Sequence, residues 1–315
     1  MAQIGSFMRK PTNANHVLLA FLSISIVLML KIDTAKTRAD DSSSSNLTST
    51  LVAQVAQDSY GISMVHIPSG TFQMGVARQT LEQLCANEFK EKDPKTCADL
   101  FDESQSILSV QTRKINGFWI DLYEVTVKDY ATCTVPGPNK NCEAVDTYLN
   151  PEYIPFMDDP QKPQVGVTWY DAMLFCNKRR ARLPTEEEWE YAAKGRENLS
   201  FPWGNKFIKE YVTAPNKSST TNSTYHVGSI PQNRSWAGVY DMAGNVSEWV
   251  EDRYQPYGTP PTNWIQDNIS RVIRGGSWED DSSKMTTFSR DRNVPEVIST
   301  RIGFRCARSD DPTAQ

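Results

Sequence analysis

The chain has 315 residues, of which 39% are hydrophobic, and it includes eight Trp, twelve Tyr and twelve Phe. This length fits one large domain or two ordinary ones, and the aromatic content is sufficient for a packed core. A formal net charge of −5 and a pI near 5.4 give no support to nucleic-acid binding through a basic surface. Eighteen Pro and sixteen Gly favour many turns over long helices.

The N-terminus has the pattern of an export signal. Arg9 and Lys10 precede an apolar run at 17–30, which has the length of a signal-peptide hydrophobic region and is short for a membrane-spanning helix. A small-x-small cleavage site follows at 37–39. We therefore expect residues 1–39 to be a signal peptide, with an uncleaved N-terminal membrane anchor as the alternative. Either makes the protein exported, that is periplasmic, cell-surface or secreted, with membrane contact only through this segment.

Composition changes again after this segment. Residues 40–57 are rich in Ser, Thr, Asp and Gln and predict a polar linker. One folded domain is expected over 58–310, because no internal repeat is visible.

The six cysteines of an exported chain favour disulfides over free thiols. Cys133 and Cys142 bracket a Pro- and Gly-rich loop, and Cys85 and Cys97 could close another short loop. Six cysteines allow about fifteen pairings, so these two remain candidates. No Cys-x-x-Cys spacing supports a redox dithiol or a zinc site.

The first predicted elements are strands. The pattern at 64–68 and 71–74 predicts a hairpin that turns at Ser69-Gly70. A polar insertion is expected at 77–106, followed by a strand at 117–121. Thr126 and Asp129 then form a capping box that opens a short helix.

Two helices have strong end signals. Thr168 and Asp171 form a capping box for a helix over 169–179, and Thr185 and Glu188 form one for the next helix, which ends at Gly195. Glu186, Glu187 and Glu188 lie in the first turn of that helix. We assign these glutamates to helix electrostatics rather than to catalysis.

The C-terminal part predicts a strand at 271–278 that ends in a tight turn and a closing strand at 301–308. Gly275-Gly276-Ser277 lacks the context of a nucleophile elbow and is interpreted as a structural turn. His66 and His226 alone cannot build a three-histidine metal site, which disfavours zinc hydrolase and three-histidine iron chemistry.

The stretch 237–250 is predicted to be a structured loop. Asp241 and Glu248 lie on either side of the turn signal Gly244-Asn245, so their side chains and the intervening carbonyls can converge on a hard cation such as calcium. Spacing alone favours the simpler interpretation, in which Asp241 caps a turn and Glu248 is solvated.

Together these motifs form a family pattern. The chain resembles the formylglycine-generating enzymes, or sulfatase-modifying factors, in the order and spacing of several segments. These are Gly70–Gly75, Arg182–Ala193, Phe201–Gly204, Gly244–Trp249, Arg274–Trp278 and Gly303–Arg305. The resemblance implies an α+β fold, loop-rich and C-type-lectin-like, with low regular secondary structure.

The resemblance also implies an activity, the oxidation of a cysteine in a Cys-x-Pro-x-Arg motif by oxygen and copper. Two cysteines after the Gly-Gly-Ser turn hold the copper in the family, because thiolates suit Cu(I). Asp280 and Met285 occupy those positions here, near Ser277 of the turn, and Ser247 stands at the position of an active-site tryptophan. We therefore expect no copper site, and leave it open whether the protein is an enzyme.

Other features implied by the resemblance are structural. A calcium ion would be held by Asp241 and Glu248 together with the carbonyls of Gly244 and Val246. A second calcium site would begin at Asn216, although the segment that completes it is shortened. The long-range disulfide of the family falls on Cys176 and Cys306.

Two functions are compatible with these observations. The first is a calcium-braced module without cysteine oxidation, presenting loops, with 278–292 as the surface, to a protein or glycan partner. The alternative is an enzyme of altered chemistry, an oxidoreductase acting on a protein or a small molecule. An accessory subunit of an active relative is a third hypothesis.

Overall fold

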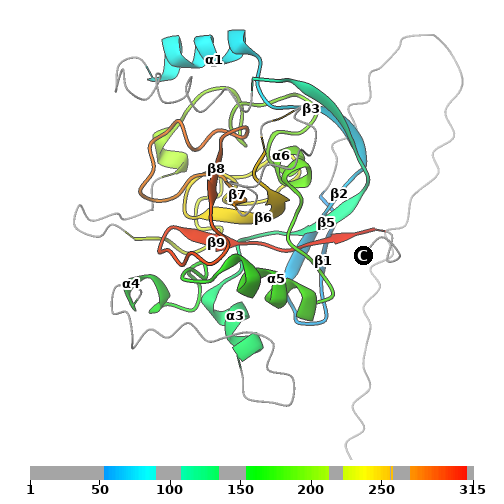
Figure 1. Cartoon of the computed structure of the whole chain (residues 1–315), viewed down its shortest axis with the longest axis vertical. Coiled ribbons are helices and arrows are strands. Elements are labelled where there is room, and N and C mark those ends of the chain that lie inside the picture. The colour runs from blue at the N-terminus through cyan, green and yellow to red at the C-terminus, as the bar shows by residue number, and fades with distance from the viewer. Residues whose placement is uncertain are drawn as a thin grey trace, which may run out of the picture. The chain divides into compact units, whose positions relative to one another are not determined.

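Residues 53–89, 108–134, 154–212, 223–255, 257 and 270–310 are described by a computed structural model of the chain. Their strands form two four-stranded sheets and a two-stranded ribbon, connected by short helices and long loops (Figure 1). All of these elements belong to the unit that starts at Thr50. The predicted signal segment 1–39 and Asn216 lie outside the described residues.

The first sheet has the strand order β1-β2-β5-β10 and is antiparallel throughout. The second has the order β8-β7-β6-β9, in which β6 and β9 are parallel, and β3 pairs with β4 in the ribbon. The strands are β1 (Val55–Gln57), β2 (Ser63–Ile67), β3 (Gly70–Met74), β4 (Gln111–Ile115), β5 (Phe118–Asp121), β6 (Ser247–Arg253), β7 (Arg271–Arg274), β8 (Arg290–Asn293), β9 (Ile302–Phe304) and β10 (Ala307–Ser309).

The helices are short. They are α1 (Arg78–Leu84), the π-helical turn η1 (Cys85–Phe89), α3 (Val127–Thr134), α4 (Ile154–Met157), α5 (Trp169–Lys178), α6 (Glu186–Lys194) and the 3-10 turn η4 (Lys209–Tyr211). Helices α5 and α6 begin at the predicted capping residues Thr168 and Thr185, and both capping boxes are complete. Gly195 follows α6 with φ 66°. None of the helices in the described ranges is both long and apolar enough to cross a membrane.

Several predicted boundaries differ from the structure. Segments 64–68 and 71–74 are not a hairpin: β2 joins the first sheet, whereas β3 pairs with β4. A side chain of α6 lies at the bend between them, because a Cβ on Gly70 would be 2.1 Å from Tyr191 Oη. Strand periodicity identifies strands without identifying their partners, so this branching could not be inferred locally.

The predicted closing strand is divided between the two four-stranded sheets. β9 ends at Phe304 and β10 begins at Ala307, and the two residues between them are fully buried. The linker boundary also moves, because β1 extends the fold into 40–57. The side chains of β1 are exposed, and its backbone pairs with β2. A polar composition does not reveal this kind of pairing.

The predicted loops contain more regular structure than composition indicated. The insertion at 77–106 begins with α1, whose Leu81 and Leu84 are buried. The loop at 237–250 runs into β6 from Ser247 onward. In both segments tertiary burial stabilises an element that has weak local signals.

One disulfide joins α5 to the C-terminal segment. Cys176 and Cys306, the pair implied by the family resemblance, are bonded across a sequence separation of 130 residues. Cys85 is also disulfide-bonded. Its predicted partner Cys97, as well as Cys142 and the side chain of Cys133, lie outside the described residues.

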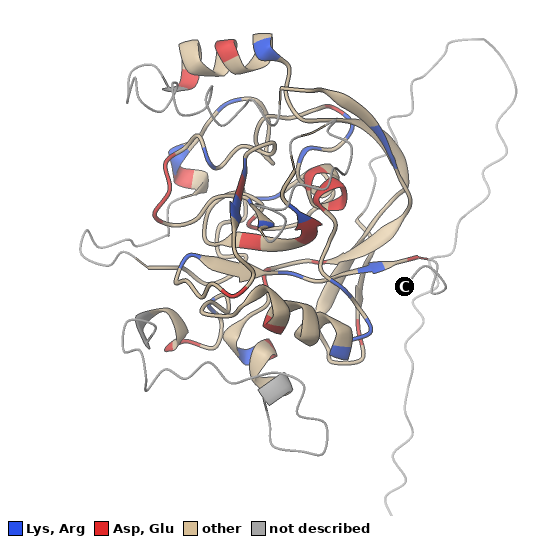
Figure 2. Cartoon of the chain, in the orientation of Figure 1, with Lys and Arg blue, Asp and Glu red and all other residues tan. Residues whose placement is uncertain are grey.

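A buried ionic network connects α6 to its surroundings. Glu190 is fully buried and accepts hydrogen bonds from Lys194, Arg274 and the backbone N–H of Gly75 at 2.7–2.9 Å. One turn earlier, Glu186 accepts two hydrogen bonds from Arg290 and one from Arg274. Figure 2 shows the acidic residues of α6 in red and the basic residues of β7 and β8 in blue. Helix electrostatics alone does not explain Glu186, since its partners come from the second sheet.

Replacing the centre of this network should be far more costly than replacing its exposed neighbour. We expect Glu190→Ala to lower the free energy of unfolding by about 3–5 kcal/mol, because it leaves buried cations uncompensated. Glu187 pairs with Arg113 at a site where both side chains are 38% exposed. The control Glu187→Ala should cost less than about 1 kcal/mol. Urea titrations followed by tryptophan fluorescence measure both, and equal losses would contradict the assignment.

Candidate functional site

The segment after β7 contains Asp280 and Met285, the two positions that the family resemblance assigns to copper binding. Gly275 and Gly276 have φ of 94° and 70°, and a Cβ on Gly276 would lie 2.9 Å from the carbonyl oxygen of Lys284. The next residue, Ser277, is fully buried. Its backbone N–H and its hydroxyl both donate to Oδ2 of Asp280, at 2.8 and 2.6 Å. Asp280 therefore closes this turn.

The second copper position and the tryptophan position are also occupied by structural residues. Met285 is buried, and its methyl group lies 3.8 Å from the position of a Cβ on Gly244. Ser247 opens β6 and its backbone N–H donates to the carbonyl of Arg301 at 2.9 Å. These positions offer one carboxylate, held in a turn, and one buried thioether. Such a donor set does not fit the two-thiolate Cu(I) site of the family.

A second cluster lies beside this turn, in the loop that precedes β6. Gly244 N–H donates to the carbonyl of Gly275, and Trp278 N–H donates to the carbonyl of Asn245, both at 2.9 Å. Asp241 and Asn245 adopt positive φ of 57° and 61°. The backbone of this loop is thus bonded directly to the segment that carries Ser277 and Asp280.

Glu248 is not solvated, in contrast to the simpler interpretation of its spacing. It is fully buried and forms a two-point ion pair with Arg305, at 2.7 and 2.6 Å. Trp189 Nε1 donates to the same carboxylate at 2.9 Å. Both oxygens of Glu248 are therefore already hydrogen-bonded, and a cation next to them would have to share them with a guanidinium.

Sequence reasoning did not identify Glu124 as a member of this cluster. Glu124 is 1% exposed, and its two oxygens accept from Asn245 Nδ2 at 2.5 Å and from Val246 N–H at 3.2 Å. Burial raises its pKa well above the ordinary value, and the charges of Asp241 and Glu248 raise it further. It lies between a strand and a capped helix with no motif around it, so no local signal was available.

Asp241 has an oxygen without a partner. Its Oδ2 accepts from Gly228 N–H at 2.6 Å, whereas Oδ1 is buried and makes no hydrogen bond to the described residues. Burial, with the charge of Glu248 as a smaller cause, raises the pKa of Asp241 to about 7.

The charges of the cluster do not balance when all its acids are ionised. The carboxylates of Glu124, Asp241 and Glu248 face the guanidinium of Arg305, which acts on all three. A bound cation would remove this imbalance, and the free oxygen of Asp241 could coordinate it. No group of three or more His, Cys, Asp or Glu side chains in the described ranges is arranged to hold a metal ion. Of the implied ligands, Asp241 fits and Glu248 is engaged elsewhere.

The comparisons with known proteins agree with the arrangement of these motifs. The model of the sulfatase-modifying factor enzyme 1-like domain matches residues 48–310. The chain therefore belongs to the sulfatase-modifying factor family, and the predicted family membership is confirmed.

Two curated relatives have opposite descriptions. The inactive C-alpha-formylglycine-generating enzyme 2 of Mus musculus is 38% identical over 161 residues, which cover 47% of this chain and 49% of that protein. The formylglycine-generating enzyme of Mus musculus is 34% identical over 177 residues, which cover 48% and 45%. The chain thus spans about half the length of the curated relatives it matches.

The predicted fold class is also confirmed. The structure of PvdO from Pseudomonas aeruginosa superposes with a TM-score of 0.58 at 23% identity, covering 81% of this chain and 98% of that one. At this identity the similarity concerns the fold alone. The described part of this chain has short helices and much loop, as the family resemblance implied.

The raised pKa of Asp241 predicts a pH dependence of stability in buffer that contains EDTA. A carboxyl whose folded pKa is about 7 contributes stability that is fully present below about pH 4 and is lost as the pH rises through 7. The free energy of unfolding should therefore fall between pH 5 and 8 by about 1–4 kcal/mol more in the native chain than in Asp241→Asn.

The matched control is Glu279→Gln, whose side chain is 57% exposed in a surface ion pair. This variant should keep the native pH profile. Denaturant titrations at several pH values measure all three proteins, and an unaltered slope in Asp241→Asn would contradict the pKa assignment.

Proposed function

We propose that this protein is an exported, non-catalytic member of its family with respect to cysteine oxidation, and that it acts as a calcium-braced module that binds a protein or a glycan. The replacement of both copper cysteines by Asp280 and Met285 carries the proposal. A relative that is named as inactive is consistent with it. The disulfide between Cys176 and Cys306 supports an oxidising compartment outside the cytoplasm.

Side-chain contacts limit what the proposed binding surface at 278–292 could offer a partner. Trp278 is not free for a partner, because its ring packs against Phe156 at 5.3 Å and its Nε1–H donates to the carbonyl of Thr300. The exposed residues of this segment are Glu279, Asp281, Asp291 and Arg292. A partner at this surface would therefore meet charged groups rather than an aromatic platform.

The calcium part of the proposal is supported by the unbonded oxygen of Asp241 and by the excess of buried carboxylates around it. The carbonyls of Gly244 and Val246 would complete the ligand set that the family implies. Arg305 would keep Glu248 oriented beside this site rather than leaving its carboxylate free. The ion would brace the loop on which the Ser277 turn rests.

Calcium should stabilise the native protein at pH 7.5. We expect about 2.7 kcal/mol of stabilisation, relative to EDTA, at a free calcium concentration one hundred times the dissociation constant. Asp241→Asn should lose most of this gain, whereas Glu279→Gln should keep it. Thermal denaturation with and without calcium measures the effect. If calcium stabilised the native protein and Asp241→Asn equally, the proposed site would be wrong.

The catalytic part of the proposal is tested with a Cys-x-Pro-x-Arg peptide incubated with the protein, copper and oxygen, next to an active family enzyme. We expect mass spectrometry to show an unchanged peptide, because neither Asp280 nor Met285 can supply a thiolate to Cu(I). Formation of formylglycine would instead support the alternative of an oxidoreductase with altered ligands.

A copper titration adds a readout that does not depend on turnover. The double variant Asp280→Cys, Met285→Cys restores the family's two sulfur donors at the same two positions. It should bind Cu(I) in competition with bathocuproine disulfonate, whereas the native chain should release Cu(I) to that chelator. Equal retention of copper by both proteins would mean that ligands elsewhere in the chain are sufficient.

A further inference from the structure

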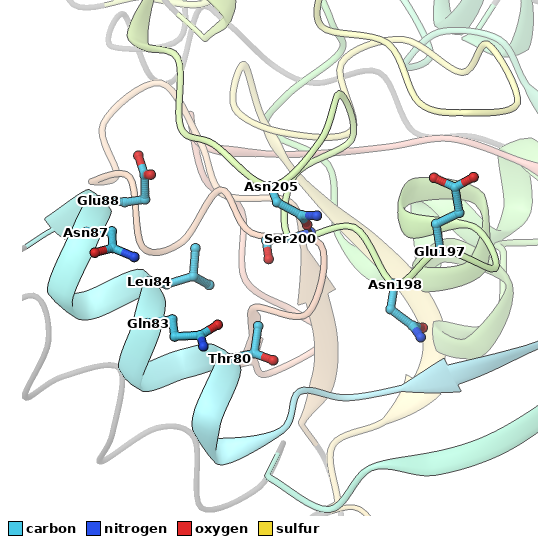
Figure 3. Close-up of a pocket in the computed structure, with 9 residues that line it drawn as sticks. All are labelled: Thr80, Gln83, Leu84, Asn87, Glu88, Glu197, Asn198, Ser200 and Asn205. Carbon is cyan, nitrogen blue, oxygen red and sulfur yellow. Dashed lines mark hydrogen bonds between the residues drawn. The ribbon is translucent and has the colours of Figure 1, made fainter.

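A groove away from the Ser277 turn has no role in the proposed function so far. It lies between α1 with its continuation η1 and the loop that follows α6, and it has a volume of about 480 Å³ (Figure 3). This is within the range of about 300–1,000 Å³ that is usual for ligand sites. Its lining residues are Thr80, Gln83, Leu84, Asn87, Glu88, Glu197, Asn198, Ser200 and Asn205.

The lining groups exclude several classes of ligand. Among the described residues, no Lys or Arg lines the groove, so these residues offer no counter-charge to an anion. Leu84 is its one aliphatic or aromatic residue, so an apolar molecule would leave the polar groups unpaired. Glu88 and Glu197 lie at opposite ends of the groove in Figure 3, which disfavours a single site for a metal ion or an ammonium group.

The groove is also lined by four side-chain amides. Those on the loop side are held by hydrogen bonds to the backbone, and those on the helix side are exposed. On the loop side, Asn198 Oδ1 accepts from Gln73 N–H at 3.2 Å and Asn205 Oδ1 accepts from Ser200 N–H at 2.9 Å. These bonds fix both side chains and leave their NH₂ groups as donors. On the helix side, Gln83 and Asn87 are exposed, and their amides provide both donors and acceptors.

Glu88 connects the two sides and orders the groove. One of its carboxylate oxygens accepts from the backbone N–H of Phe207, at 3.3 Å, so the end of the helix is bonded to the loop across the groove. Positioned donors on one wall and exposed amides on the other suit a neutral molecule with many hydroxyl groups. Each hydroxyl can donate and accept at once, which neither an ion nor a hydrocarbon can do.

A smaller hollow of about 210 Å³ adjoins the groove and shares Thr80, Asn198 and Ser200 with it. Val76, Ala77, Val110 and Phe288 contribute apolar surface there. Lys194 also lines the hollow, but its ammonium group is bonded to Glu190 at 2.8 Å. The combined surface is amphipathic, with amides at one end and mainly carbon atoms at the other. A sugar ring has the same division, since its hydroxyls lie at the rim and its C–H groups on the faces.

We propose that the groove between α1 and the 197–205 loop binds a neutral oligosaccharide. This proposal rests on the proposed function in one respect, since it names a glycan as the partner of the binding module. It places the contact mainly on α1 and the loop after α6, and Phe288 in the adjoining hollow comes from 278–292. The absence of cysteine oxidation is tested independently, so the two proposals can fail separately.

Saturation-transfer NMR on the full chain tests binding with chitotriose, cellotriose, maltotriose and mannotriose as probes. We expect saturable binding of at least one of them. The double variant Gln83→Ala, Asn87→Ala should weaken this binding about tenfold or more, because it removes the exposed amides from one wall. Alanine favours the helix, so the variant should fold, which circular dichroism verifies.

Two further variants distinguish this groove and this ligand class from others. Glu82→Ala changes an exposed residue of the same helix that does not line the groove, and it should leave binding unchanged. Glu197→Gln should alter the affinity for a neutral sugar by less than about threefold, since no full charge is paired. Tetralysine serves as the cationic probe.

Three results would overturn the proposal. The first is that no trisaccharide binds. The second is binding that survives intact in Gln83→Ala, Asn87→Ala, which would place the site elsewhere. The third is tetralysine binding that Glu197→Gln abolishes while the trisaccharides show none, which would assign the groove to a basic peptide.

Discussion

The burial of Glu190 against Lys194 and Arg274 is the interaction on which the rest of this fold depends. Ionised groups this deep are costly unless every charge is paired and hydrogen-bonded, and here each partner comes from a different part of the fold. The ribbon, α6 and the second sheet are thereby held in one relative position. With so little regular secondary structure to align them, such polar contacts take over a role that long helices have elsewhere.

The positions that the family resemblance assigns to the active site also have structural contacts here. Asp280 uses its carboxylate to close the turn onto Ser277, and Met285 packs within the core beside Gly244. The two positions that the family resemblance assigns to copper-binding cysteines are therefore occupied here by residues that stabilise the loop. The backbone of that loop is hydrogen-bonded to the Asp241 loop, so bracing either one restrains the other.

Charge distribution divides the molecule into two functional environments. The Asp241 cluster is buried and rich in carboxyl groups, and the pKa values of Glu124 and Asp241 are raised mainly by that burial. The groove beside α1 is lined mainly by amides and hydroxyls. In the two proposals, the calcium ion at the first region would provide rigidity, and the groove would recognise a glycan.

The sequence by itself determined the family, the two capped helices and the turn at Gly275-Gly276, because these depend on short-range patterns of capping and backbone conformation. It also located Asp241 and Glu248 but not their surroundings. Only the tertiary structure decided that Glu248 is paired with Arg305, that Glu124 joins the cluster, and that β2 and β3 separate into different sheets. Each of these contacts joins residues far apart in the chain, and their energies come from burial and charge pairing that no local pattern encodes.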